Sequence, residues 1–471
     1  MRHALLACLC LAAPACSADA PGSTEGAGGA GPGLEPWPPL AAGPATGAGG
    51  ADPATELPAR YPADRVLSPV TPYVADRLRA IAQAVPGRDE RVFLKAGASG
   101  TVSQNLLFCF AGLPGAFYTV DFASEAPLTA SLEHFRAGDA AGTTPFDRPT
   151  LCAEVGRTAA WALSGDPSPL ERELAAIDPR FAVVNYGTND MEMGATYRAA
   201  LFPFFDDLSA LVDRLLAEGV VPLVSGLGPR GDSVEAARWV PTYDAVTRAI
   251  AEARQVPYLD LYRAYVGLPG QGLSADGVHG NVYVDGGVTL PCVFDPLGLE
   301  HAYNTRNLYT LRAFDLMRRV VVAGEAGPDA PVAPVAGRGS LADPFVVDGL
   351  PFTHGSDTAS AAPSTFDAYP ACDAGQDESG PERLYRLELA AETALRIVVL
   401  DGAGVDVDLH LLGADAEPAS CLARHDRVLE RTLPAGVYHL VVDTFVGGAG
   451  PAAGPYTLVA LACEPGDPAC L

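Results

Sequence analysis

Short valine-rich runs alternate with amphipathic segments through the middle of this chain, and this alternation constrains the fold more than any other feature. The runs cover residues 92–97, 181–187, 220–226 and 256–262. Over residues 203–217 the apolar side chains recur every three or four positions, which predicts a helix with its proline in the first turn. Strands that alternate with helices form a parallel sheet with helices on both faces. We therefore predict an α/β domain.

The pattern changes after Ser340. Apolar and polar residues alternate in several short runs separated by Gly, Pro and Asp, which predicts an all-β sandwich. In residues 405–412, Val405, Val407, Leu409 and Leu411 would share the buried face. The residues between them would then lie on a polar, solvated face.

The length of 471 residues favours two folded domains joined by linkers. We predict a signal peptide with a lipobox-like end at 1–16, a Gly/Ala/Pro-rich disordered tether at 17–61, the α/β domain at 62–323, a linker at 324–340 and the β-sandwich accessory domain at 341–471.

The N-terminus has the features of an export signal. A charged start, Met1-Arg2-His3, precedes an apolar run over 4–13 and the small-residue exit "PACS". The stretch "LAAPAC" resembles the lipobox of bacterial lipoproteins, with Ala13 where that motif usually has Leu. The resemblance implies lipidation of Cys16 and a cell-envelope location. Simple secretion is the alternative.

Charge and cysteines support an exported protein without nucleic-acid partners. The net charge of −26 would repel phosphate backbones and anionic lipid, so a membrane would be reached only through an N-terminal lipid anchor. Seven of the ten cysteines lie beyond Cys16, and an oxidising compartment permits disulfides. The expected pairs are Cys109 with Cys152, Cys372 with Cys421 and Cys463 with Cys470, which leaves Cys292 free.

No Cys-x-x-Cys pair or Cys/His cluster suggests zinc, so no metal site is predicted from cysteine or histidine spacing. Six histidines receive no role and are expected at the surface or half-buried: His134, His301, His354, His410, His425 and His439.

Reactive side chains follow the predicted strands, where active sites of parallel sheets form. Ser99 lies in "KAGASGTVS", Asn189 in "GTND", and Asp276 with His279 in "SADGVHGN". A nucleophilic serine needs a base, and the base needs a group that holds its tautomer, which His279 and Asp276 supply from one loop. Lys95, before Ser99, would favour an anionic substrate or would be an inward-facing strand residue.

Together with Gly156 in "EVGRTA", these stretches resemble the four blocks of the SGNH (GDSL-type) hydrolase family over residues 65–322. The resemblance implies a flavodoxin-like sheet, Ser99 as nucleophile, His279 as general base and Asp276 as its orienting carboxylate. It also implies an oxyanion hole from the backbone N–H groups of Ser99 and Gly156 and the amide of Asn189.

Two features of these blocks bear on the activity. Ala98 replaces the usual Asp of the first block, which would lower the rate or mark a chain that has drifted from catalysis. Asp190 is interpreted as a turn carboxylate that accepts backbone N–H groups. No G-x-S-x-G elbow is present, which argues against an ordinary α/β-hydrolase.

The implied function is an exported serine ester hydrolase that acts through an acyl-serine intermediate. Its substrate would be an acyl or acetyl ester of carbohydrate, lipid or envelope material. The alternative is a catalytically silent SGNH-fold lipoprotein for surface binding or adhesion.

The C-terminal stretches "DGLPFTHGSDT", "DVDLHLL" and "LPAGVYHLVVDT" resemble bacterial pre-peptidase C-terminal domains. This resemblance implies an accessory role without catalysis. No cofactor is expected, although four carboxylates offer the hard oxygen ligands that calcium prefers. These are Asp401, Asp406, Asp408 and Asp443. A solvated strand face is the competing interpretation of the alternating Asp406 and Asp408.

Overall fold

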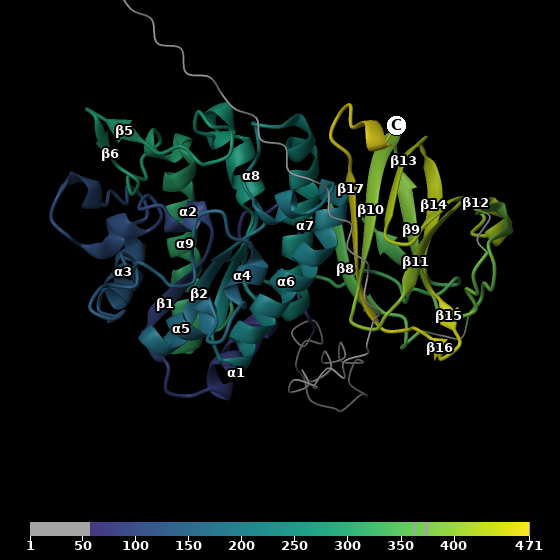
Figure 1. Cartoon of the computed structure of the whole chain (residues 1–471), viewed down its shortest axis with the longest axis horizontal. Helices are drawn as coiled ribbons and strands as arrows, with labels where there is room; N and C mark the ends of the chain where they lie inside the picture. The colour runs from purple at the N-terminus through teal and green to yellow at the C-terminus, as the bar shows by residue number, and fades with distance from the viewer. Residues whose placement is uncertain (1–56, 362–363, 373–374, 471) are drawn as a thin grey trace, which may run out of the picture. The chain divides into compact units, whose positions relative to one another are not determined.

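The computed structural model describes residues 57–361, 364–372 and 375–470 (Figure 1). The predicted signal peptide, Cys16 and nearly all of the predicted tether lie outside these residues. Within the described part of the chain, no helix is both long and apolar enough to cross a membrane.

A parallel sheet forms the centre of the N-terminal half. Its strands are β1 (Asp89–Gly97), β2 (Pro179–Asn185), β3 (Val221–Ser225) and β4 (Tyr258–Leu259), in the order β1-β2-β3-β4. A parallel bridge joins Ala153 to Gly97 on the free edge of β1. The segment at Ala153 therefore takes the place of the second strand, which completes the flavodoxin-like order 2-1-3-4-5. The predicted α/β class is confirmed.

Helices surround this sheet (Figure 1). They are α1 (Pro72–Ala84), α2 (Ser99–Val102), α3 (Thr129–Arg136), α4 (Ala159–Ala162), α5 (Pro169–Ile177), α6 (Tyr197–Ala217), α7 (Val234–Arg254), α8 (Leu261–Val266) and α9 (Ala302–Met317). Helix α6 corrects one expectation, because Thr196 caps it and Pro203 lies inside it rather than in its first turn. A short hairpin, β5 (Val284–Asp285) with β6 (Val288–Thr289), precedes α9.

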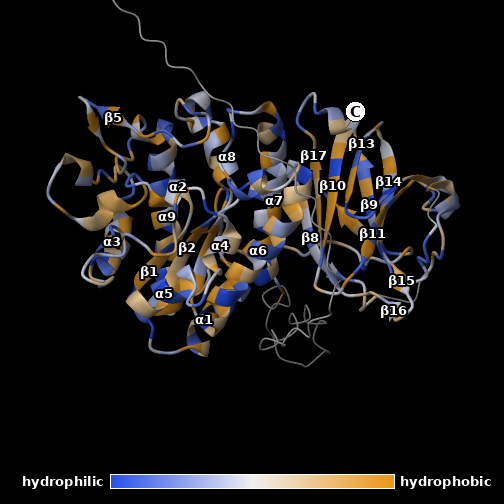
Figure 2. Cartoon of the chain, viewed as in Figure 1, coloured by the Kyte–Doolittle hydropathy of each residue, from blue (hydrophilic) through white to orange (hydrophobic). Residues whose placement is uncertain are grey.

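Two further sheets form the C-terminal region, and Figure 2 shows hydrophobic residues along their strands. One has the order β13-β10-β17-β8 and the other β12-β11-β14-β9-β7. The strands are β7 (Phe345–Val347), β8 (Phe352–Asp357), β9 (Arg383–Leu389), β10 (Thr393–Asp401), β11 (Val407–Leu412), β12 (Cys421–His425), β13 (Val428–Leu433), β14 (Gly436–Thr444) and β17 (Pro455–Ala462), with the small pair β15 (Val446–Gly447) and β16 (Gly450–Pro451).

The core between these two sheets confirms the predicted inward face of β11. Val407, Leu409 and Leu411 are buried in one apolar cluster with residues of both sheets. The opposite face corrects the prediction, because Asp408 and His410 are also buried there. Residues of the segments 364–372 and 375–382 cover them, which no local pattern in β11 could indicate.

Helix α7 packs against β8 and β17, so the two halves share a core. The guanidinium of Arg396, on β10, is fully buried in this contact and lies 3.7 Å above the ring of Trp239. It also donates to Glu430 and Asp467, each at 2.7 Å, and to Thr242 at 3.1 Å. The described residues 57–361, 364–372 and 375–470 consequently lie in one compact unit. The domain boundaries at 62, 324 and 341 stay predictions, and residues 324–340 contain no helix or strand.

The disulfides confirm two predicted pairs and correct the third. Cys372 bonds to Cys421, and Cys463 bonds to Cys470. Cys109 bonds to Cys292 rather than to Cys152, and the Cys152 thiol is free and buried.

The reason for the corrected pairing is a contact made by α9. The Asn307 amide donates to the carbonyls of Asn105 and Pro291 at 2.8 and 3.0 Å. It thereby brings the chain before Cys109 beside the chain before Cys292.

Candidate active site

Ser99 is presented by a tight turn at the carboxyl end of β1. The strand ends at Gly97, Ala98 precedes α2, and Ser99 is the first residue of that helix. A Cβ on Gly97 would lie 2.7 Å from the Asn185 carbonyl oxygen, so only glycine permits this close approach of β1 to β2. The turn thus places the Ser99 side chain at the edge of the sheet.

Asp276 and His279 reach this edge from a loop closed on itself. The Asp276 Oδ1 atom accepts hydrogen bonds from the backbone N–H groups of Val278 and His279 and from the Ser274 hydroxyl, each at 2.9 Å. Gly277 has a φ of +70°, and a Cβ there would lie 2.7 Å from the Asp232 nitrogen. Glycine is therefore required at the centre of the loop.

The three predicted catalytic side chains lie in one line of hydrogen-bond distances. Nε2 of His279 is 2.7 Å from Oγ of Ser99, and Nδ1 of His279 is 2.6 Å from Oδ2 of Asp276. The hydrogen bonds from the His279 N–H, the Val278 N–H and the His279 ring hold the pKa of Asp276 well below its usual range. The arrangement has the geometry of a Ser-His-Asp triad.

The predicted oxyanion residues Gly156 and Asn189 are brought beside each other. The Asn189 amide donates to the carbonyl of Arg157 at 3.0 Å, and Gly156 has a φ of +77°. Among the described residues, neither belongs to the lining of the cavity beside Ser99, where Thr188 is found. Their oxyanion role stays a prediction.

Asp190 has the structural position expected of it. Its carboxylate accepts from the backbone N–H groups of Gly187 and Ala159, both at 2.8 Å. Burial raises the pKa of Asp190 to about 6. This buried carboxylate joins the turn that carries Asn189 to the start of α4.

A cavity of about 70 Å³ opens beside Ser99 and His279. Sequence reasoning missed two of its polar lining residues, Asn185 and Arg306. The Arg306 guanidinium, from α9, donates to the Asn185 side-chain oxygen at 3.0 Å and to the Gly100 carbonyl at 3.3 Å. The signal for it was the run of four polar residues Asn304–Asn307, because such a run needs partners where a helix is buried.

Lys95 is an inward-facing strand residue. It is 1% exposed, its ammonium donates to the Phe146 carbonyl at 2.8 Å, and it lies 4.3 Å from the centre of the Phe108 ring. Burial lowers the pKa of Lys95 to about 7. It is not among the residues that line the cavity beside Ser99, so the sequence-based link to an anionic substrate finds no support in this placement.

Comparison with known families identifies part of the α/β region. Residues 136–283 match the model of the GDSL-like Lipase/Acylhydrolase family. The match includes Gly156, Asn189, Asp276 and His279 and begins after Ser99, so the position of Ser99 rests on the geometry above. No curated protein matches the sequence.

Solved structures resemble the two regions separately. A GDSL-like lipase from Bacteroides thetaiotaomicron is 14% identical, with 51% of this chain and 98% of that chain covered and a TM-score of 0.30. A catalytic mutant of an acetylxylan esterase from Geobacillus stearothermophilus is 14% identical, with 48% and 95% covered and a TM-score of 0.32.

The C-terminal region has a neighbour of its own. The pre-peptidase C-terminal domain of a collagenase from Bacillus anthracis is 16% identical, with 24% of this chain and 91% of that chain covered and a TM-score of 0.17. At these identities and TM-scores, none of the three structures bears on substrate or mechanism. The chain therefore contains a region at 136–283 that matches the GDSL-like lipase/acylhydrolase family, within a parallel α/β fold that a β-rich C-terminal region follows.

Proposed function

We propose that this hydrolase cleaves carboxylic esters through an acyl-serine intermediate. The observation that carries the proposal is the pair of short distances from His279, to Ser99 at 2.7 Å and to Asp276 at 2.6 Å. His279 takes the Ser99 proton as Oγ attacks the ester carbonyl, then passes it to the leaving alcohol. It next takes a proton from water as the water oxygen attacks the acyl-serine, and it returns that proton to Ser99 Oγ as the acid leaves.

The transition state of each step carries a negative charge on the former carbonyl oxygen. We assign its stabilisation to the backbone N–H groups of Ser99 and Gly156 and the Asn189 amide, as the family resemblance implies. The hydrogen bond between Asn189 and Arg157 supports this assignment, because it holds the amide beside the Gly156 turn. One such donor contributes roughly 10²- to 10³-fold to the rate.

The cavity supports a short acyl group. Its volume of about 70 Å³ is small, which favours a short acyl group such as acetyl over a long chain. Leu261 and Tyr265 supply apolar lining. The substrates we propose are acetyl or other short acyl esters, with acylated polysaccharide or envelope material as their source.

The test compares hydrolysis of acetyl, butyryl and octanoyl aryl esters by residues 57–471 and by a Ser99→Ala variant. Loss of the nucleophile should lower turnover by about 10⁴-fold or more, because no acyl-enzyme can form. Acetyl esters should be the best substrates. An organophosphonate should modify Ser99, as located by mass spectrometry of the labelled peptide.

The matched control is Ser103→Ala. Ser103 directly follows the same short helix. Its hydroxyl accepts a hydrogen bond from the Asn105 N–H at 3.2 Å and makes none with His279. It should retain activity. Equal turnover by the parent and Ser99→Ala proteins, with no phosphonate adduct, would contradict the proposal. It would instead favour the alternative of a catalytically silent binding protein. The present geometry does not favour that alternative, because a silent site has no need to keep the triad aligned.

We also propose export, with Cys16 as a lipid anchor. Three disulfides among the described residues support an oxidising compartment. Mass spectrometry of the mature N-terminus from the native host tests this. A diacylglyceryl-modified Cys16 is the expected result, and an unmodified terminus after cleavage would indicate simple secretion.

A further inference from the structure

A group of ionisable side chains is buried far from Ser99 in the sequence, on the outer face of the sheet that contains β11 and β14. Phe366 and Tyr369 pack on this face against Leu384 and Val441. Further along the same covering segment, the Gln376 amide donates to Asp408 at 2.9 Å. Residues 364–372 and 375–382 therefore enclose side chains that strand periodicity alone would place in water.

Three members of the group have side chains that are completely shielded from solvent. Glu378, His410 and Asp443 are each 0% exposed. Both carboxylate oxygens of Glu378 and both ring nitrogens of His410 lack a hydrogen-bond partner among the described residues. A buried polar atom without a partner costs free energy, and native proteins seldom retain four in one place.

The charges of the group are also unbalanced. Asp408 is 2% exposed and lies beside Glu378 and Asp443 in this layer. Among the described residues, the Arg424 guanidinium lies 3.0 Å from Asp408 and 3.6 Å from Glu378, and no ion pair joins a basic side chain to Asp443. A buried excess of negative charge requires a further cation or the uptake of protons.

We propose that Glu378, His410 and Asp443 bind one divalent transition-metal ion, of which zinc fits the donor set best. One candidate ligand atom from each residue lies within 4.8 Å of the others. Zinc takes imidazole nitrogen and carboxylate oxygen at about 2.0–2.2 Å, so binding would draw these side chains slightly closer. Calcium prefers six to eight oxygen ligands and would make no use of His410.

A neighbouring side chain already orients two of the proposed ligands. Tyr369 stacks on the His410 ring, with centroids 3.6 Å apart and planes inclined by 12°. The Tyr369 hydroxyl donates to the Asp443 carboxylate. At metal sites, contacts of this kind with the ligating side chains fix the orientation of the imidazole ring and of the carboxylate. The ion would connect the 375–382 segment to β11 and β14, which is a structural role.

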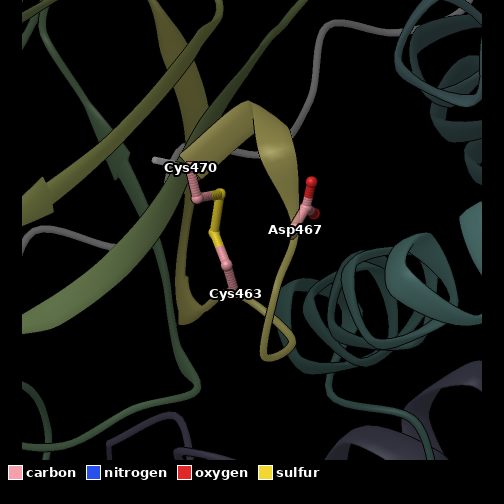
Figure 3. Close-up of side chains that lie close together, drawn as sticks. All are labelled: Cys463, Asp467 and Cys470. Atoms are coloured by element: carbon pink, nitrogen blue, oxygen red, sulfur yellow. A yellow bond between two sulfur atoms is a disulfide. The ribbon is translucent and has the colours of Figure 1, made fainter.

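A second cluster, of Cys463, Asp467 and Cys470, contains residue types that can bind metals but does not support a metal site. Cys463 and Cys470 form a disulfide, so neither sulfur is a thiolate. Figure 3 shows the Asp467 carboxylate directed away from that disulfide, and it accepts from Arg396 at 2.7 Å. The metal proposal rests on Glu378, His410 and Asp443 alone.

The first experiment measures metal content of the full mature chain by plasma mass spectrometry, before and after dialysis against a chelator. We expect about one zinc per chain, lost with the chelator and restored by zinc. The melting temperature should fall on removal and recover with zinc but not with calcium. Ester hydrolysis should change little, so the outcome is separate from that of the proposed catalytic function.

Variants assign the ligands. His410→Gln and Glu378→Gln should each retain less than a tenth of the parent zinc content. Asp377→Asn is the control, because Asp377 is exposed and adjacent to Glu378 in the chain. It should bind zinc as the parent does.

Two results would overturn the proposal. The first is a chain that takes up no zinc, together with a Glu378→Gln variant that is as stable as the parent or more stable, as expected for a buried acid without an ion. The second is calcium binding that His410→Gln leaves intact. If a variant fails to fold, the chelator and readdition measurements on the parent chain decide between these results.

Discussion

At the scale of single residues, the arrangement around Asp276 explains how a carboxylate in an exposed loop can orient His279. Oδ1 is occupied by two backbone N–H groups and the Ser274 hydroxyl, which leaves Oδ2 for the His279 ring. These bonds favour the ionised form, so the pKa of Asp276 is lowered. Because the folded pKa is depressed, the resulting stabilisation is present above the unfolded pKa of about 4 and is lost as pH falls through the folded value.

Asp276→Asn tests the orienting role. The amide keeps the size of the side chain but presents an N–H to His279 or forces the other tautomer, so kcat should fall by about 10³- to 10⁴-fold. In the parent protein, any ester hydrolysis lost on acidification above about pH 4 should reflect a group other than Asp276. The measurement is a pH–rate profile of kcat for both proteins.

Asp285→Asn provides a control on an exposed carboxylate in the hairpin that follows. It should leave kcat unchanged. Full activity in Asp276→Asn would show that His279 needs no carboxylate for its orientation.

At the scale of elements, α9 organises the site although it contributes no member of the triad. Asn304, Arg306 and Asn307 are buried on it and donate to carbonyl or amide oxygens in three separate stretches of chain, at 100–105, 185 and 290–293. Arg306 contacts the Gly100 carbonyl, directly after Ser99. The turn that carries Ser99 is therefore supported by a helix that follows it by about 200 residues.

Asn307→Ala tests the contribution of α9 to stability. It would leave the Leu107 N–H and the carbonyls of Asn105 and Pro291 without their partner. We expect a loss of about 2–4 kcal/mol in the free energy of unfolding, since each buried unsatisfied group costs about 1–3 kcal/mol. Urea denaturation with the Cys109–Cys292 disulfide intact measures this loss. A change below about 0.5 kcal/mol would mean that water replaces the amide.

At the scale of the whole molecule, the two regions are held by one continuous contact rather than by a flexible linker. Val398, Leu400, Val459 and Leu461 of the β region belong to the same apolar cluster as the helices around the parallel sheet. Helix α7 is accordingly buried on most sides, with weak amphipathicity, as expected for a helix between two packed layers.

Arg396→Ala tests this contact. Removing the guanidinium leaves Glu430 and Asp467 buried without their cation, so we expect a loss of about 3–5 kcal/mol in the free energy of unfolding. Arg386→Ala is the control, since its ion pair with Glu388 is exposed and should contribute less than about 1 kcal/mol. Chemical denaturation measures both variants. Equal stability of the two would indicate that the regions are held by apolar packing alone.

The sequence by itself determined the features that depend on neighbouring residues. Valine-rich runs and helical periodicity predicted the parallel sheet, and period-two alternation predicted the inward face of β11. The spacing of Asp276 and His279 placed both in one loop, and their alignment with Ser99 followed from the shared edge of the sheet. These are local patterns that the backbone geometry of strands and helices imposes.

Only the tertiary structure decided which distant segments meet. It paired Cys109 with Cys292 through Asn307, and it buried His410 and Asp408 beneath a segment that precedes β9. It also placed Arg306 behind Ser99 and Arg396 against α7. Each of these contacts closes a long stretch of chain, and its position follows from the packing of whole elements rather than from any pattern within one of them.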